Sequence, residues 1–452
     1  MRHHRYLSYA LSALSIAACS DEPAGQVEAD TFTPSDTSVA PDTTRPDPEP
    51  SGFEIASSAY ERDLDPSTTE AELAALVAGN TSFALDLYRW LRTAEPEENL
   101  FYSPHSISVA LAMTWAGARG TTAEEMASTL HFELPDAALH AGMNRLALEL
   151  DSREDIEVPE GEPFTLRVSN AIWGLDDYPY EQPFIDTLAK DYGAGLHLVD
   201  FVGDPDASRD TINGWIAERT NDLIPELIPD GVIKPTTRMV LTNAIYFLAG
   251  WLSPFDEALT AKAPFANRDG TSAEVDMMKL PEAELAYAEV DGHQIVELPY
   301  VGEAVSMVVI LPADGQFETF EASLDTARLT ALTSALGRSF GTLEMPKLQL
   351  RSQFSLARAL SELGMPTAFG GGADLTGIAS LEHLFIQDVI HEGVVIIDEE
   401  GTEAAAATAV VVGTDSEPVS SFEMTVDRPY LFVIRDRPTG AILFVGRVVS
   451  MD

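Results

Sequence analysis

The spacing of apolar residues predicts several helices in the first half of the chain. Ser67 and Glu70 have the spacing of a capping box and favour a helix that Gly79 would end. After this stop, apolar residues recur on one helical face, at Phe83, Leu87, Trp90 and Leu91. A second capping-box pattern at Thr122 and Glu125 predicts a further helix.

Apolar runs of strand length follow these helical patterns. Residues 305–311 read as a buried strand, and residues 430–434 and 441–449 as two strands of a hairpin whose turn contains Pro438 and Gly440. Helical and strand patterns mix without a repeat or a Pro/Ser-rich linker after residue 67. The pattern therefore predicts one α+β domain over residues 67–452.

The part before this domain has a different composition. Residues 19–66 are rich in Asp, Glu, Pro, Thr and Ser and poor in apolar residues, which predicts a disordered acidic tether. The whole chain has 73 acidic and 27 basic residues, a formal charge of -46. Such a charge repels a nucleic-acid backbone and opposes self-association, so a monomer that binds no nucleic acid is expected.

The first 18 residues have the features of a lipoprotein signal peptide. Arg2 and Arg5 precede an apolar stretch at residues 7–17 that is too short to span a bilayer. Small residues stand directly before Cys19, the only cysteine, and this arrangement resembles the lipobox of bacterial lipoproteins. We expect cleavage after residue 18, a lipid anchor on Cys19 and an extracytoplasmic location. Ser20 favours the outer membrane or cell surface, with the side of the membrane left open.

Familiar enzyme motifs are absent from the sequence. There is no G-x-S-x-G, H-E-x-x-H, P-loop or G-x-G-x-x-G, and no pair of the nine histidines has metal-ligand spacing. His391 and Glu392 begin like a zinc-protease motif, but Val395 stands where the second histidine would be. We therefore expect no catalytic residues, no metal and no cofactor. A Ser-His-Asp triad assembled only in space stays open as an alternative.

Residues 402–415 have the pattern of a strand that nothing anchors. One alternate set of residues is small or β-branched and uncharged, namely Thr402, Ala404, Ala406, Thr408, Val410, Val412 and Thr414. The other set carries both charges, Glu403 and Asp415, and turn-forming residues follow. The segment could enter a sheet or remain a plain surface loop or edge strand, and the pattern alone leaves both open.

The residues around this segment resemble the hinge of inhibitory serpins. The hinge comprises Glu399, Glu400, Gly401, Thr402, Glu403, Ala404, Ala405, Ala406, Ala407 and Thr408. Other serpin-like motifs stand in the order typical of the family, at residues 99–108, 117–122, 212–220, 241–251, 427–432 and 440–448. The likeness covers residues 80–450.

The resemblance implies a serpin fold with three β-sheets, eight or nine helices and an exposed reactive-centre loop. It implies a serine-type endopeptidase inhibitor, not an enzyme, whose partner is a serine or cysteine protease. The cleaved loop of such an inhibitor enters the central sheet while the protease is still covalently attached. A non-inhibitory serpin that acts as a binding or chaperone module is the alternative, although its usual mark is a charged or bulky hinge.

The resemblance also implies two groups of site residues. The sheet-opening cluster would contain Ser103, Ser106, Asn243, Trp251 and His391. Counting from Gly401 places the reactive bond between Asp415 and Ser416, which implies a target that prefers acidic residues. The spacing from Gly401 to Pro429 is longer than usual, so Val412, Gly413 and Thr414 remain alternatives, and Val412 or Thr414 would imply an elastase-like or subtilisin-like target.

Overall fold

A computed structural model describes residues 53–154, 165–381, 384–402 and 421–451 of the chain. The chain divides into two units, and every described residue belongs to the second, Pro50–Asp452. The predicted signal peptide, Cys19 and most of the predicted tether lie outside the described residues.

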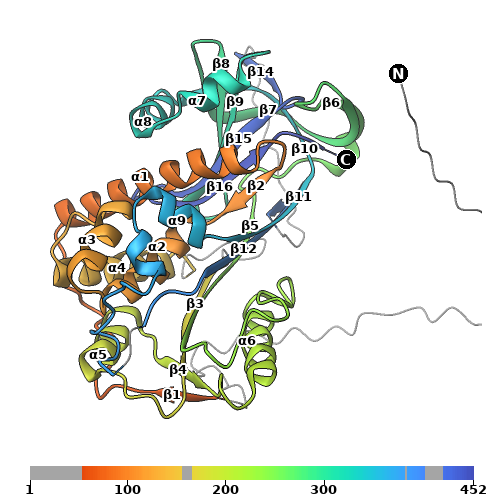
Figure 1. Ribbon diagram of the computed structural model, residues 1–452. Coiled ribbons are helices and arrows are strands. Elements are labelled where there is room, and N and C mark those ends of the chain that lie inside the picture. The colour runs from red at the N-terminus through yellow and green to blue at the C-terminus, as the bar shows by residue number, and fades with distance from the viewer. Residues whose placement is uncertain (1–52, 155–164, 382–383, 403–420, 452) are drawn as a thin grey trace, which may run out of the picture. The chain divides into compact units, whose positions relative to one another are not determined.

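Seven strands form the sheet that holds the site, here called the central sheet (Figure 1). Their order is β1 (Glu54–Ala56), β4 (Leu196–Val199), β3 (Thr165–Leu175), β5 (Met239–Gly250), β13 (Gly401–Thr402), β12 (Val389–Ile397) and β11 (Leu348–Ser355). Nearly every residue of β5 is buried, as expected for a strand that is covered on both faces. β3 runs antiparallel to β5, whereas β12 runs parallel to it.

The other described strands pair into one second sheet. Its members are β14 (Phe422–Thr425), β10 (Gly337–Pro346), β7 (Ser272–Val290), β8 (His293–Pro299), β9 (Val305–Leu311), β15 (Tyr430–Asp436), β16 (Ile442–Val448), β2 (Leu100–Tyr102) and β6 (Ala261–Ala266), the last paired to β7. The predicted strand at 305–311 and the C-terminal hairpin are confirmed. Where the resemblance implied three sheets, hydrogen bonds join the described strands into two. The reason is the 19-residue β7, which pairs with β6, β10 and β8 in turn and has a positive φ at Glu282.

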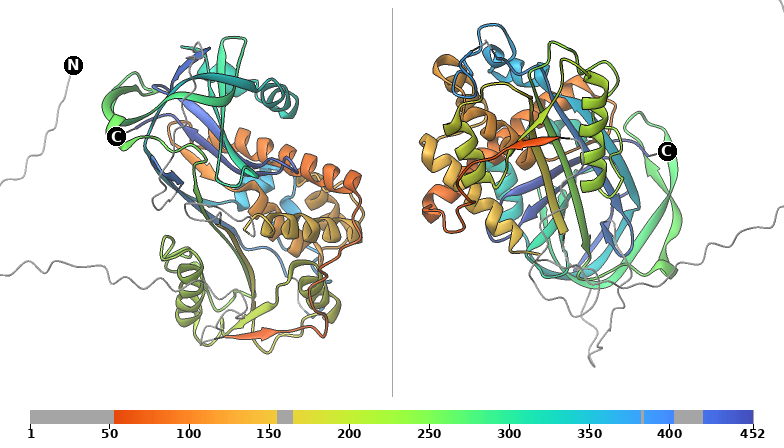
Figure 2. Two further views of the ribbon diagram at one scale, coloured as in Figure 1. Left: turned by 180° about the vertical axis from the view of Figure 1, so that it is seen from behind. Right: turned by 90° about the horizontal axis from the view of Figure 1, so that it is seen from below.

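Nine α-helices lie within the described ranges, in agreement with the eight or nine expected. They are α1 (Glu70–Ala94), α2 (Pro104–Trp115), α3 (Gly120–Thr129), α4 (Asp136–Asp151), α5 (Gln182–Tyr192), α6 (Pro205–Arg219), α7 (Phe317–Ala322), α8 (Thr326–Ser334) and α9 (Ala357–Leu363), with short 3-10 turns at Glu257–Leu259 and Pro366–Phe369. In Figures 1 and 2, α6 covers one face of the central sheet, and α1, α2 and α4 lie on the other side.

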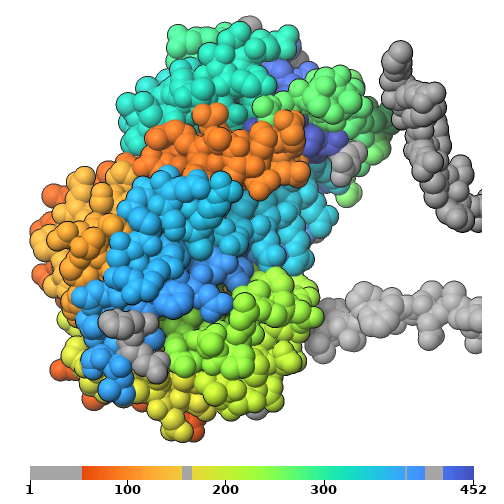
Figure 3. Space-filling view, in the orientation of Figure 1, coloured from red at the N-terminus to blue at the C-terminus, as the bar shows by residue number. Residues whose placement is uncertain are grey.

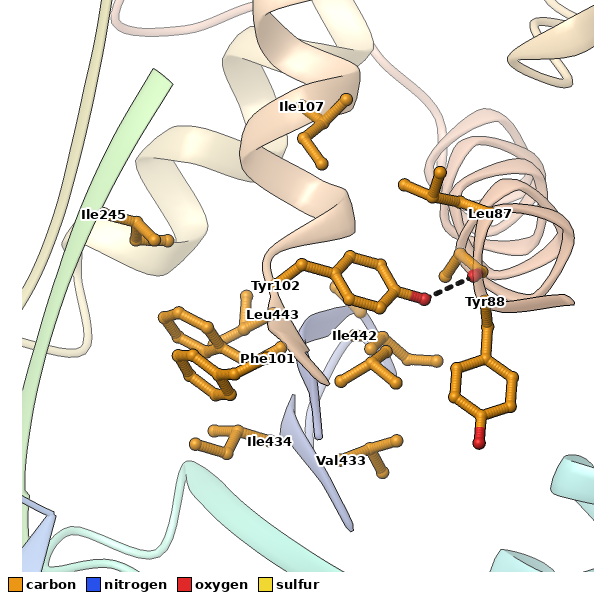
Figure 4. Close-up of a cluster of buried hydrophobic side chains, with 14 of the residues drawn as sticks. Leu87, Tyr88, Phe101, Tyr102, Ile107, Ile245, Val433, Ile434, Ile442 and Leu443 are labelled. Carbon is orange, nitrogen blue, oxygen red and sulfur yellow. Dashed lines mark hydrogen bonds between the residues drawn. The ribbon is translucent and has the colours of Figure 1, made fainter. Parts of the chain in front are cut away.

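The larger core lies between α1, α2 and the two sheets (Figure 4). Side chains from α1, β2, α2, β15 and β16 meet there, among them Leu87, Phe101, Ile107, Val433 and Leu443. The buried hydroxyl of Tyr102 donates to the Ala84 carbonyl, 2.7 Å away, so its polar atom has a partner. A smaller core beneath α6 includes Trp173 and Trp215.

The predicted helix stop at Gly79 is wrong, because Gly79 lies inside α1, which is 25 residues long. The helix begins two residues later than expected, with Thr69 and Glu72 as its capping box. Gly79 serves close packing instead: a Cβ there would lie 2.4 Å from the His131 carbonyl oxygen.

The predicted capping box at Thr122 and Glu125 is also wrong. The helix α3 begins after Arg119, so both residues lie inside it. The Thr122 hydroxyl accepts a hydrogen bond from the Asp374 backbone, and the Glu125 carboxylate accepts two from Thr367. These side chains join α3 to a distant segment, which the local pattern could not reveal.

The boundary expected between tether and domain at residue 66 is also too late. Residues 53–66 are described, and β1 within them pairs with β4 at the edge of the central sheet. A three-residue strand is too short to show a period of two, so the composition of the surrounding segment dominated the prediction.

Candidate functional site at the parting of the central sheet

The central sheet parts between β5 and β12. At one end these strands pair directly, from Val389 opposite Leu241 to Gly393 opposite Ile245. At the other end β13 lies between them, with Thr402 opposite Ala249 on β5 and opposite Ile397 on β12. The first residue of the predicted inserting face, Thr402, is therefore already inside the sheet.

A tight turn brings the chain from β12 back into this gap. The Asp398 carboxylate accepts hydrogen bonds from the backbone of Glu400 at 3.0 Å and of Gly401 at 3.2 Å. The Asp398 backbone in turn donates to the Gly401 carbonyl. A side chain at Gly401 would place its Cβ 2.2 Å from the Ala249 carbonyl oxygen, so glycine allows the two backbones to approach. Sequence reasoning found Gly401 but missed Asp398, whose role of bonding the backbone just after it is typical of Asp in turns.

The buried Thr402 contacts one of two stacked aromatic side chains. Its side chain is 1% exposed, and its hydroxyl lies 2.8 Å from the Tyr300 hydroxyl. Tyr300 stacks on Trp251 at 4.6 Å, and the Trp251 indole donates to the Asp398 carbonyl. Burial raises the pKa of Tyr300 well above its usual value, so this hydroxyl remains a neutral hydrogen-bonding partner. The predicted cluster member Trp251 therefore lies beside the hinge.

An ion pair holds the start of the hinge. The side chain of Glu399 is 5% exposed. Its carboxylate lies 2.5 Å from the Lys347 ammonium and accepts a hydrogen bond from the Thr260 hydroxyl at 2.6 Å. Burial by itself raises the pKa of Glu399, but these two bonds outweigh it and the net pKa is lowered. The bond to Glu399 raises the pKa of Lys347, so both partners are charged at neutral pH.

A buried polar network spans the closed part of the sheet. His391 on β12 accepts a hydrogen bond at Nε2 from the Ser103 backbone, and its Nδ1 contacts the Asn243 side-chain oxygen on β5. The Nε2 bond assigns the proton to Nδ1, which donates to Asn243. Asn243 donates to Ser106 and to Asn170, both at 2.6 Å.

This network crosses the line along which the sheet parts. The structure brings together Ser103, Ser106, Asn243 and His391. It adds Asn170 on β3, which the resemblance had not implied as a member of the cluster. Burial lowers the pKa of His391 to about 3, so its imidazole is neutral at physiological pH. A charged imidazole could not keep the acceptor role at Nε2.

The remaining hinge and reactive-bond residues lie outside the described residues. They are Glu403, Ala404, Ala405, Ala406, Ala407, Thr408, Val412, Gly413, Thr414, Asp415 and Ser416. The chain is described again at Ser421, whose backbone and side chain bond to Phe340, and β14 then pairs with β10. The undescribed segment therefore joins the central sheet to the second sheet.

The described residues contain neither a candidate metal site nor a helix suited to crossing a membrane. Outside the undescribed ranges, no group of three or more His, Cys, Asp or Glu side chains could hold a metal ion. Within the same residues, no helix combines the length and the apolar character that crossing a membrane requires.

Comparison with known proteins gives one consistent family. The sequence profile of the family described as Serpin (serine protease inhibitor) matches residues 78–451. The leukocyte elastase inhibitor of Bos taurus is 37% identical over 383 residues, which are 83% of this chain and 99% of that protein. An uncharacterized serpin-like protein of Thermococcus kodakarensis is 38% identical over 372 residues, 82% of this chain and 84% of its own.

Solved structures give the same result. Uncleaved ovalbumin superposes with a TM-score of 0.75 at 26% identity, covering 83% of this chain and 100% of that one. Serpin48 of the insect Tenebrio molitor superposes with a TM-score of 0.72 at 30% identity, covering 83% and 98%.

Proposed function

The chain belongs to the serpin family, and we propose that it inhibits a serine-type endopeptidase by inserting its cleaved loop into the central sheet. The loop would be cut as a substrate, and the protease would stay attached as an acyl-enzyme while the loop enters between β5 and β12. Inhibition, unlike catalysis, is also what the family description names.

The observation that carries the proposal is the double pairing of β13. Gly401 and Thr402 run antiparallel to β5, and Thr402 also pairs with β12. The residues that follow would continue the same two ladders, and the alternate set begins with the small residues Ala404 and Ala406. About a dozen new ladder hydrogen bonds at ~1 kcal/mol each would rival the folding stability of a whole domain.

The two ends of the loop explain why the uncut chain would not insert. Thr402 is held in the central sheet and Ser421 is held on β10 of the second sheet. A loop tied at both ends can run the length of the gap only after β14 leaves β10, whereas a cut loop has a free end. The uncut state would then be kinetically trapped.

The target depends on which bond is cut. Asp415 before Ser416 favours a protease that prefers acidic residues, whereas Val412 or Thr414 favours an elastase-like or subtilisin-like protease. The inhibitor of leukocyte elastase among the relatives makes an elastase a reasonable member of the test panel.

A protease panel tests the proposal directly. The chain is incubated with an elastase, a subtilisin, a glutamyl endopeptidase and a caspase, and the products are separated under denaturing conditions. We expect a covalent complex with one of these enzymes and a released C-terminal peptide whose mass identifies the bond. Cleavage by several enzymes without any covalent complex would contradict inhibition and favour the non-inhibitory alternative.

We also propose that Cys19 carries a lipid that anchors a monomeric chain to the cell envelope, at the outer membrane or cell surface. The basic start, the short apolar stretch and the small residues before the lone cysteine support this. Cys19→Ala should move the protein from the membrane fraction to the soluble fraction. Equal partitioning of the two forms would contradict the anchor.

A further inference from the structure

Residues 53–66, here called the N-terminal clamp, connect the edge of the central sheet to two helices. We propose that the clamp holds the outer half of this sheet, strands β5, β3 and β4, against α4 and α5 and thereby slows the opening of the uncut protein. The inference rests on the proposed loop insertion. The clamp precedes residues 78–451, which the family profile matches.

At the sheet, the clamp adds an edge strand and an aromatic contact. β1 runs antiparallel to β4, with Ile55 opposite His197, and Figure 2 shows the two strands side by side. The Phe53 ring lies 5.0 Å from Trp173 and 4.8 Å from His197, between centroids. This end of the clamp therefore moves with β3 and β4.

At the helices, the clamp is held by polar contacts. Arg62 donates to the buried Asn144 side chain of α4 at 2.9 Å and to Asp151 at 3.2 Å. Asn144 donates back to the Asp63 carbonyl at 2.6 Å, and the Asp63 backbone donates to Lys190 of α5. This end of the clamp therefore stays with α4 and α5. In Figure 3 the red atoms of the first described residues lie at the lower margin, beside yellow and yellow-green residues.

Two glycines make room for the clamp. A Cβ at Gly195 would lie 2.2 Å from Cγ2 of Ile55, and one at Gly193 would lie 2.9 Å from Cδ of Arg62. Gly193 also has a φ of +61°, which favours glycine in its own right. The receiving surface is thus shaped at both points by the absence of a side chain.

The outer half is the side of the sheet that would shift on insertion, because the other side is tied to the second sheet. β11 and β12 contact β2, and β2 pairs with β16 of the second sheet. An inserted strand widens a sheet by ~4.8 Å, so β5, β3 and β4 must shift across the helices. A cavity of about 160 Å³ lies in their path, lined by residues that include Leu166, Val168 and Asn170 of β3, His105 of α2 and Arg62 of the clamp. Movement of β3 there would disturb Arg62 and its bonds to α4.

The test compares two arginine variants of the full chain. Each uncut protein is incubated at one elevated temperature without protease, and conversion to a form that resists denaturant is followed on urea gels. Arg62→Ala should convert about tenfold faster than wild type, because the bonds that resist the shift are lost. Arg153→Ala is the matched control: it loses a bond of 2.9 Å between the turn after α4 and Asp436 of the second sheet, and it leaves the clamp intact. It should lower the melting temperature without faster conversion.

A second pair of variants tests the same contact through packing. Gly195→Ala should speed conversion by displacing Ile55, and Ile55→Ala added to it should bring the rate back toward wild type, because the clashing Cγ2 is removed. Equal rates for Arg62→Ala and wild type, or an equal rise in Arg153→Ala, would overturn the clamp. Failure of the proposed function shows elsewhere, as the absence of a covalent protease complex in every variant including wild type.

Discussion

At the residue scale, three of the described hinge residues each meet a different physical constraint. Gly401 lies against the Ala249 carbonyl, where a Cβ has no room. Thr402 fills a buried position with a partner for its hydroxyl, and Glu399 is neutralised by Lys347. Small size, one satisfied polar atom and one paired charge let this part of the chain sit in the sheet at little cost.

Replacement of Thr402 by arginine should convert the inhibitor into a substrate. The guanidinium would have to be buried against Tyr300, so the hinge should leave the sheet and insert slowly after cleavage. We expect the number of inhibitor molecules consumed per protease trapped to rise at least severalfold. Thr402→Val keeps the shape and loses only the hydroxyl, so it should stay close to wild type. Equal values for Arg and Val would contradict this role of Thr402.

The folded protein should become less stable as the pH falls, in part because the buried His391 resists protonation. Its pKa is about 3 in the folded protein, below the usual value near 6.5, so the unfolded chain binds the extra proton between these limits. The contribution is therefore present above about pH 6.5 and is lost as pH falls toward about 3. His105 and His197, each with a pKa lowered by burial to about 4, act in the same direction.

Urea unfolding at several pH values between 7 and 5 checks this. The free energy of unfolding of the wild type should fall by up to ~1.4 kcal/mol per pH unit for each such histidine at the acidic end of the range. His391→Gln should be less stable at pH 7 but should have a smaller pH slope. An unchanged slope in this variant would show that His391 does not titrate in the assumed way.

At the element scale, the sequence was most informative where one pattern extended over many residues. The strand at 305–311 and the C-terminal hairpin were predicted from their apolar runs, and the family motifs brought Ser103, Ser106, Asn243 and His391 together. β1 could not be predicted, because its three residues form a strand only through their pairing with β4, which the local sequence does not show. The role of Gly79 also depends on a distant contact, the His131 carbonyl.

That contact makes a stability prediction for α1. Gly79→Ala would place a Cβ 2.4 Å from a backbone oxygen, so it should destabilise the protein by ~2 kcal/mol or more despite the better helix propensity of alanine. Gly142→Ala in α4 is the control, since its Cβ would meet Leu76 at an ordinary 3.4 Å. We expect it to be neutral or stabilising by up to ~1 kcal/mol. Equal effects of the two in thermal unfolding would contradict this account of Gly79.

At the scale of the whole molecule, the central feature is a sheet whose strands β5 and β12 pair at one end and are separated by β13 at the other. The loop that could enter between these strands begins inside the central sheet at Thr402 and returns on the second sheet at Ser421. The buried network around His391 closes the strands at one end, and the proposed clamp steadies their outer edge. In the proposed mechanism, release of one loop end by a protease lets the sheet reach a lower free energy.

Differential scanning calorimetry before and after loop cleavage tests this claim most directly. The chain is cut within residues 403–420 by a protease that does not form a complex, and both forms are melted under the same conditions. A gain of about a dozen ladder hydrogen bonds predicts that the cut form melts higher by ~15 °C. A cut form that melts at or below the temperature of the intact chain would contradict insertion, and with it the proposed mechanism of inhibition.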